Sequence, residues 1–127
     1  MSIIQYKSSD ELAMHAVKGL QDKKGIEIVL INLKNTPNSV TDYFVIASGS
    51  SDTHVDALSI SVDKVLNEEC NEEPMSVEGR TNREWILLDY GNVIIHVFKE
   101  SARKFYALEQ LWGDAEITKI EEKEVND

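Results

Sequence analysis

The sequence has few of the residues that build covalent links and metal centres. It contains one cysteine, Cys70, which excludes an internal disulfide and a zinc site made of clustered cysteines. Its three histidines, His15, His54 and His96, are far apart along the chain and show no HxxxH-type pairing. We therefore expect neither a metal nor a cofactor.

Long apolar runs are missing, and the chain does not open with a positively charged stretch followed by an apolar one. A membrane-spanning helix needs about 20 predominantly apolar residues, and no stretch approaches that length. We expect a cytoplasmic protein without membrane contact. The length of 127 residues, 42% of them hydrophobic, suits one domain with its own core.

Basic residues are scarce. The chain carries 13 Lys and Arg against 23 Asp and Glu, a net charge of −10. Nucleic-acid binding depends on clustered Lys and Arg, and the longest basic groups are Lys23-Lys24 and Arg103-Lys104. We expect little direct contact with nucleic acid. The acidity fits a basic protein partner or serves solubility alone, and charge by itself favours solubility.

What the chain does have is strands interleaved with helices. Ser8 and Glu11 form a capping-box pattern before the apolar positions of a first helix. The expected elements are a helix after Ser8, strands at 26–33 and 43–48, a helix at 52–69, a short peripheral strand at 76–79, a hairpin over 84–98 and a helix over 101–112. This order predicts an α/β fold with a single mixed β-sheet of about five strands packed with about three helices.

The predicted domain covers residues 1–115. The remaining segment, 116–127, is charged and lacks a sustained apolar face, so we expect a mobile tail.

The stretch DYFVIASGSSDTHV, residues 42–55, places a Gly/Ser turn between a strand and a helix, where a nucleotide-binding protein would hold phosphate. The turn lacks the lysine of a P-loop and the spacing of GxGxxG. Gly49 can end the strand, and Ser51, Asp52 or Thr53 can cap the helix with no ligand present. A nucleotide-binding, transferase-like enzyme is the alternative, but the paired strand carboxylates that hold magnesium in nucleotidyltransferases are missing.

Nucleophilic catalysis finds no support either. No GxSxG elbow is present, and Cys70 lies in an acidic segment that would raise the pKa of its thiol. His96 alternates with apolar residues in a strand, a pattern more typical of a packed histidine than of a catalytic one. These features predict that the protein is not an enzyme.

The clearest local pattern is EWILLDYGNVIIHVF, residues 84–98, where two β-rich runs flank Gly91-Asn92. A two-residue turn of this composition predicts a tight hairpin. Alternation places Trp85, Leu87 and Asp89 on one face of the first strand, and Ile86, Leu88 and Tyr90 on the other. Trp85 could anchor an interface or fill the core, and the pattern leaves both open.

Three ordered motifs carry a family resemblance: TDYFVIASGSSDTHV at 41–55, EWILLDYGNVIIHVF at 84–98 and FYALEQLWGDA at 105–115. The chain resembles the Iojap-like family, the ribosomal silencing factors, up to about Ala115. The resemblance implies a nucleotidyltransferase-like fold without catalytic residues. It also implies binding to ribosomal protein L fourteen on the large subunit, a block to subunit association that represses translation under nutrient limitation, and a homodimer when free.

The resemblance further suggests partner-binding positions. Trp85 and Tyr90 would supply contact area, while Asp89 and Glu109 would offer carboxylates to Arg or Lys. Tyr43 and Trp112 are the most readily explained as core residues. At 52–53 the chain has Asp-Thr where the family often has a small residue and an Arg, which weakens any role of this helix start in RNA contact. The full set of matched positions is Asp42, Tyr43, Trp85, Asp89, Tyr90, His96, Tyr106, Glu109 and Trp112.

Overall fold

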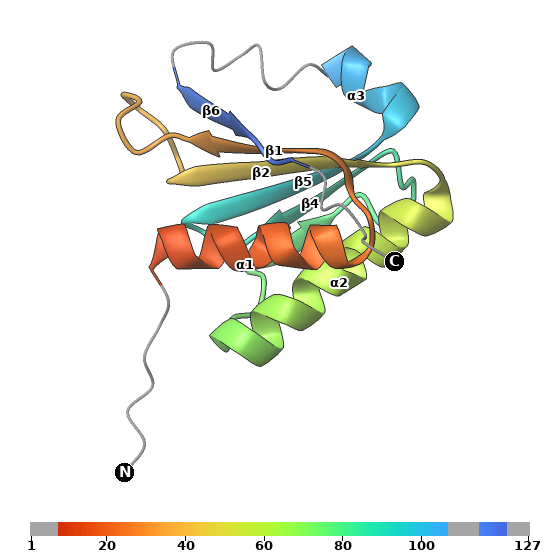
Figure 1. The fold of residues 1–127 in the computed structure, drawn as a ribbon, viewed down its shortest axis with the longest axis horizontal. Helices are drawn as coiled ribbons and strands as arrows, with labels where there is room; N and C mark the ends of the chain where they lie inside the picture. Colours follow the sequence, from red (N-terminus) through yellow and green to blue (C-terminus); the bar gives the residue numbers. More distant parts are fainter. Residues whose placement is uncertain (1–7, 107–114, 122–127) are drawn as a thin grey trace.

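The structure, a computed structural model, describes residues 8–106 and 115–121 (Figure 1). Its elements, in chain order, are α1 (Ser9–Asp22), β1 (Ile26–Asn32), β2 (Tyr43–Gly49), α2 (Asp52–Cys70), β3 (Ser76–Glu78), β4 (Trp85–Asp89), β5 (Val93–Lys99), α3 (Glu100–Tyr106) and β6 (Glu116–Lys119). The predicted order of helices and strands is confirmed, with α3 followed to Tyr106 in the described part of the chain.

The strands form one mixed sheet in the order β3-β4-β5-β2-β1-β6. Among the described strands, β2 and β5 alone pair in parallel, and the other neighbours are antiparallel. A parallel pair needs a long crossover, which α2, β3 and β4 supply between β2 and β5. The predicted mixed α/β sheet is confirmed, and it has six strands where about five were expected.

The additional strand is β6, which lies within the segment predicted as a mobile tail. It pairs antiparallel with β1, with Ile117 opposite Ile31, and all four of its residues are exposed. No strand was predicted here, because an edge strand gains its hydrogen bonds from the backbone and needs no sustained apolar face. Residues 122–127 lie outside the described part.

The start of α1 follows its capping signal. The Glu11 N–H donates to Ser8 Oγ (3.2 Å), and the Ser8 N–H donates to Glu11 Oε1 (3.4 Å), so the predicted capping box is present. The apolar face of the helix is buried as expected, with Leu12, Ala16 and Leu20 at 1% exposure or less.

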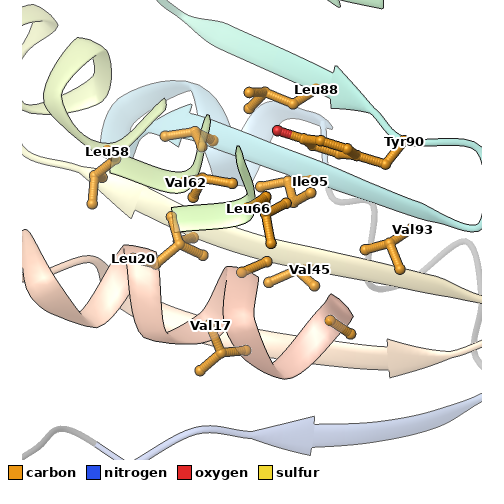
Figure 2. Close-up of a cluster of buried hydrophobic side chains, with 14 of the residues drawn as sticks. Val17, Leu20, Val45, Leu58, Val62, Leu66, Leu88, Tyr90, Val93 and Ile95 are labelled. Atoms are coloured by element: carbon orange, nitrogen blue, oxygen red, sulfur yellow. The ribbon is translucent and has the colours of Figure 1, made fainter. Parts of the chain in front are cut away.

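Helices α1 and α2 cover one face of the sheet, and α3 lies toward the other (Figure 1). We call the face under α1 and α2 the inner face. The two helices approach closely at Gly19, where a Cβ would lie 3.0 Å from the Val62 Cα, and Ser61 Oγ donates to the Gly19 carbonyl (2.7 Å). Figure 2 shows the core between the helices and the inner face, including Leu20, Leu66 and Ile95. Each fully buried side chain of this size contributes about 1.5–3 kcal/mol.

The predicted hairpin is confirmed. Gly91 has a φ of 86°, as a primed two-residue turn requires at its first central residue, and the Tyr90 N–H donates to the Val93 carbonyl (2.9 Å). Along β4 the buried side chains are Ile86 and Leu88, which confirms the predicted alternation. The hairpin therefore gives one apolar face to the core and the other to the opposite side of the sheet.

Candidate functional site

The face of the sheet that α1 and α2 do not cover gathers several predicted site residues. Strand register aligns Trp85 with Phe98, Leu87 with His96 and Asp89 with Ile94 across β4 and β5. The parallel pairing of β2 and β5 then brings Phe44 beside Ile94. We call this set the outer face: Phe44, Trp85, Leu87, Asp89, Ile94, His96 and Phe98.

An aromatic cluster stiffens the outer face. The Trp85 ring stacks on Phe98 with centroids 5.1 Å apart and planes at 25°. Phe44 meets His96 edge to face at 4.7 Å and 80°. These are favoured geometries for aromatic pairs, worth about 0.5–1.5 kcal/mol each beyond the area they bury. The cluster holds the Trp85 ring in a fixed position on the sheet.

A hydrogen bond inside this cluster sets the chemistry of His96. Trp85 Nε1 donates to His96 Nδ1 at 3.0 Å. Because an indole N–H can only donate, Nδ1 must accept, and the neutral ring therefore carries its proton on Nε2. His96 is 3% exposed, and burial lowers its pKa to about 4. His96 is thus a neutral, packed residue, as the alternation in its strand predicted. Its Nδ1 also orients Trp85 by accepting the indole N–H.

The part of the outer face that remains accessible is an apolar strip. Trp85, Leu87 and Ile94 are half-buried, whereas their inner-face neighbours are fully buried. Two carboxylates border this strip: Asp89 lies opposite Ile94, and Glu78 of β3 lies opposite Leu87. Apolar side chains with carboxylates at their edge suit a protein surface that carries Lys or Arg.

The two predicted aspartates lie near the hairpin turn. Asp89 Oδ1 accepts from the Gly91 N–H (2.8 Å), which orients the carboxylate, and the side chain stays half-buried. Asp42 is half-buried immediately before β2, where its N–H donates to the Asn92 carbonyl (3.1 Å). The fold brings the ends of β2 and of the β4–β5 hairpin together, so both carboxylates lie at one end of the sheet.

Two of the three predicted tyrosines, Tyr43 and Tyr90, are buried. Tyr43 is 8% exposed, and its hydroxyl donates to Asp10 Oδ1 (2.7 Å), which confirms it as a core residue. Burial, followed by this hydrogen bond, raises the pKa of Tyr43. Tyr90 is 6% exposed on the inner face, where Figure 2 shows its ring near Leu88 and Leu66, and burial raises its pKa.

The predicted role of Tyr90, to supply contact area to a partner, does not fit this buried position. The residue shares the parity of Ile86 and Leu88, so the pleat of β4 turns it toward α2 and away from the outer face. Tyr106 is the last residue of α3, and its side chain lies outside the described part of the chain, as do Glu109 and Trp112.

Sequence reasoning missed Phe44, Ile94 and Phe98 as members of the outer face. Ile94 and Phe98 join it through the register of β5 against β4 in the hairpin. Phe44 joins it through the parallel pairing of β2 with β5, which links segments about fifty positions apart in the chain. Alternation within each strand indicates which residues share a face, but it does not reveal which strands are neighbours. That missing information is the sheet order.

The Gly/Ser turn is closed by the protein's own groups. The His54 N–H donates to Ser51 Oγ (3.1 Å), and the Ser50 N–H donates to His54 Nδ1 (2.9 Å). His54 Nε2 then bonds the Lys23 carbonyl (2.8 Å), and a Cβ at Gly49 would lie 2.9 Å from the Val55 N. Ser51 therefore caps α2 through its own side chain, and the capping interpretation of this turn is confirmed.

Comparison with known proteins agrees with the family resemblance of the three sequence motifs. A family model described as "Ribosomal silencing factor during starvation" matches residues 6–127. The chain belongs to this family. It is 37% identical over 114 residues to the ribosomal silencing factor of Halalkalibacterium halodurans, covering 90% of this chain and 96% of the relative. It is 33% identical over 106 residues to the ribosomal silencing factor of Bacillus subtilis, covering 84% of this chain and 88% of that relative.

A solved structure agrees with the fold. The crystal structure of a Chromobacterium violaceum protein superposes with a TM-score of 0.79 at 32% identity, covering 84% of this chain and 88% of that one.

As a ribosomal silencing factor family member, the chain is a translation regulator associated with the ribosome. Among the described residues, no helix has the length and hydropathy needed to span a membrane.

Proposed function

We propose that this ribosomal silencing factor binds ribosomal protein L fourteen through its outer face and blocks association of the ribosomal subunits. The observation that carries the proposal is the half-buried strip of Trp85, Leu87 and Ile94 bordered by Asp89 and Glu78. A rigid aromatic anchor within a patch of this kind is typical of protein interfaces. The bulk of the bound protein would then obstruct the small subunit and repress translation under nutrient limitation.

Charge supports a basic protein as the partner. The chain has a net charge of −10, which favours encounter with a positively charged surface and disfavours direct contact with nucleic acid. In this proposal the protein acts in the cytoplasm, without cofactor or catalysis, as a steric block. Off the ribosome it forms a homodimer.

The test is a subunit-joining assay. Purified large and small subunits are mixed with the protein and separated on a sucrose gradient. The expected result is fewer joined ribosomes, with the protein co-sedimenting on the large subunit. Undiminished joining at saturating protein, without co-sedimentation, would contradict the proposal. A pull-down with isolated ribosomal protein L fourteen then separates this partner from any other large-subunit component.

A further inference from the structure

An exposed apolar side chain lies on the helix-covered side of the molecule, away from the outer face. Ile60 of α2 is 56% exposed, although most large apolar side chains of the described helices are buried. It lines two adjoining hollows of about 500 and 600 Å³, which share Ile60, Lys64 and Glu68. We call the surface formed by these three residues with Asp63 and Glu73 the α2 hollow. Ile60 is its apolar centre.

The α2 hollow carries more negative charge than its own cations neutralise. The carboxylates that line the two hollows outnumber the two lysines there, Lys23 and Lys64, and they are Asp22, Asp63, Glu68, Glu69 and Glu73. Asp63, Glu68 and Glu73 lie around Lys64. None of these three carboxylates takes part in an ion pair with another described residue. Glu69, at the rim, differs because Lys18 Nζ lies 2.9 Å from its Oε2. The hollow is therefore acidic, with uncompensated carboxylates around an exposed apolar side chain.

The position of Glu68 near the C-terminal end of α2 is unfavourable in the free protein. The C-terminal end of a helix carries a partial negative charge and favours cations, by about 0.3–1 kcal/mol per charge. The last turn of α2 has no basic residue and instead carries Glu68 and Glu69. Residues that are unfavourable for the local structure are found more often at functional surfaces than elsewhere. A bound cation beside Glu68 would compensate both the carboxylates and the helix end.

We propose that the α2 hollow docks a basic protein segment whose large apolar side chain covers Ile60. The apolar group would bury Ile60, and flanking Lys or Arg would pair with Asp63, Glu68 and Glu73. A second copy of this chain fits poorly, because it would bring like charges together. The α2 hollow lies on the helix side of the sheet, so both the hollow and the outer face can be occupied at once (Figure 1).

The proposal is tested on the full chain by NMR titration with synthetic peptides. The probe is a short peptide with several lysines around one central leucine. Two matched peptides replace that leucine by serine, or the lysines by glutamates. We expect the lysine–leucine peptide to shift amide signals along α2, with roughly tenfold weaker binding for the serine peptide and none for the glutamate peptide. Raising the salt concentration should weaken the binding further.

Variants separate the hollow from other surfaces. Ile60→Ser, and the double variant Glu68→Gln with Glu73→Gln, should each weaken peptide binding roughly five- to tenfold. Met14→Ser removes an equally exposed apolar side chain (51%) on α1 and should leave binding unchanged. Leu87→Ser alters the outer face and should also leave it unchanged, so failure here is independent of the proposed ribosomal function.

Three outcomes would overturn the inference. Peptide shifts confined to the outer face would move the site to the other side of the sheet. Equal binding of the leucine and serine peptides would leave only non-specific charge attraction. Shifts around Ile60 that depend on protein concentration alone would show that a second copy covers it.

Discussion

Leu87 and Leu88 are neighbours in the chain with opposite surroundings. Leu88 points to the inner face, is 0% exposed and packs in the cluster that α1 and α2 complete. Leu87 points to the outer face, lies beside His96 and stays half-buried. The difference comes from the pleat of β4 alone. One face of the strand therefore stabilises the fold, while the other remains available for a partner.

The side of the sheet that α1 and α2 do not cover divides into two regions. Toward β1 and β2 it is closed, with Ile31 and Ile46 both at 0% exposure. Toward β4 and the hairpin, Trp85, Leu87 and Ile94 are accessible. The buried region contributes to the stability of the sheet. The accessible region is the part that a partner can contact. The predictions below test whether stability and binding separate along this division.

The largest expected effect is on the inner face. Leu88→Ala should lower the free energy of unfolding by about 3 kcal/mol, because a fully buried leucine leaves a cavity. Leu87→Ala should cost about 1 kcal/mol or less, since its side chain is already partly in water. Urea denaturation followed by circular dichroism measures both values. Similar losses for the two variants would remove the distinction between the faces.

The burial of His96 should make the free energy of unfolding depend on pH, with an effect of nearly the same size. Its pKa of about 4 lies below the ordinary value of 6.5, so the unfolded chain binds the proton first as the pH falls. Its contribution is complete above pH ~6.5 and is lost between there and pH ~4, by about 3 kcal/mol in all. Unfolding free energies measured across this range should fall less steeply in His96→Gln than in the unchanged protein. Equal slopes would show that His96 is not a buried neutral residue.

Trp85→Phe should have a smaller effect. It keeps an aromatic ring against Phe98 but removes the donor to His96 Nδ1. Leaving that acceptor unpaired should cost about 1–2 kcal/mol. Because the lost hydrogen bond favours the neutral ring, the pKa of His96 should also rise, which NMR titration of the imidazole can follow. An unchanged His96 pKa would argue against this bond.

The smallest expected change in stability is in Asp89→Asn. The amide oxygen can still accept from the Gly91 N–H, so the free energy of unfolding should change by less than about 0.5 kcal/mol. The carboxylate charge is lost, so affinity for ribosomal protein L fourteen should fall about five- to tenfold. Calorimetric titration gives the affinity, and a thermal melt gives the stability. Unchanged affinity would place Asp89 outside the contact.

Local signals predicted most of the fold. The capping box of Ser8, the turn at Gly91-Asn92 and the alternation along β4 each depend on residues close in sequence, and each is present. Strand β6 was missed because backbone pairing at a sheet edge leaves no apolar signature. The contacts of Phe44 were missed because they require the order of the strands.

The sequence also identified only some of the residues of the candidate site. Parity alone already grouped Tyr90 with Ile86 and Leu88, and this grouping described its surroundings better than the family motif did. Trp85 could not be resolved from its pattern, because it is both packed against Phe98 and half-exposed. A residue that supports the fold and borders solvent has no distinct sequence signature.

The face of the sheet that meets the large subunit decides whether the outer face is the binding surface. The decisive measurement is co-sedimentation of large subunits with Leu87→Lys, compared with Met14→Lys, which places the same charge at an exposed apolar position of α1. Both variants are first shown to be folded by circular dichroism. We expect Leu87→Lys to lose binding to the large subunit and Met14→Lys to retain it. Retained binding of a folded Leu87→Lys protein would contradict the assignment of the outer face.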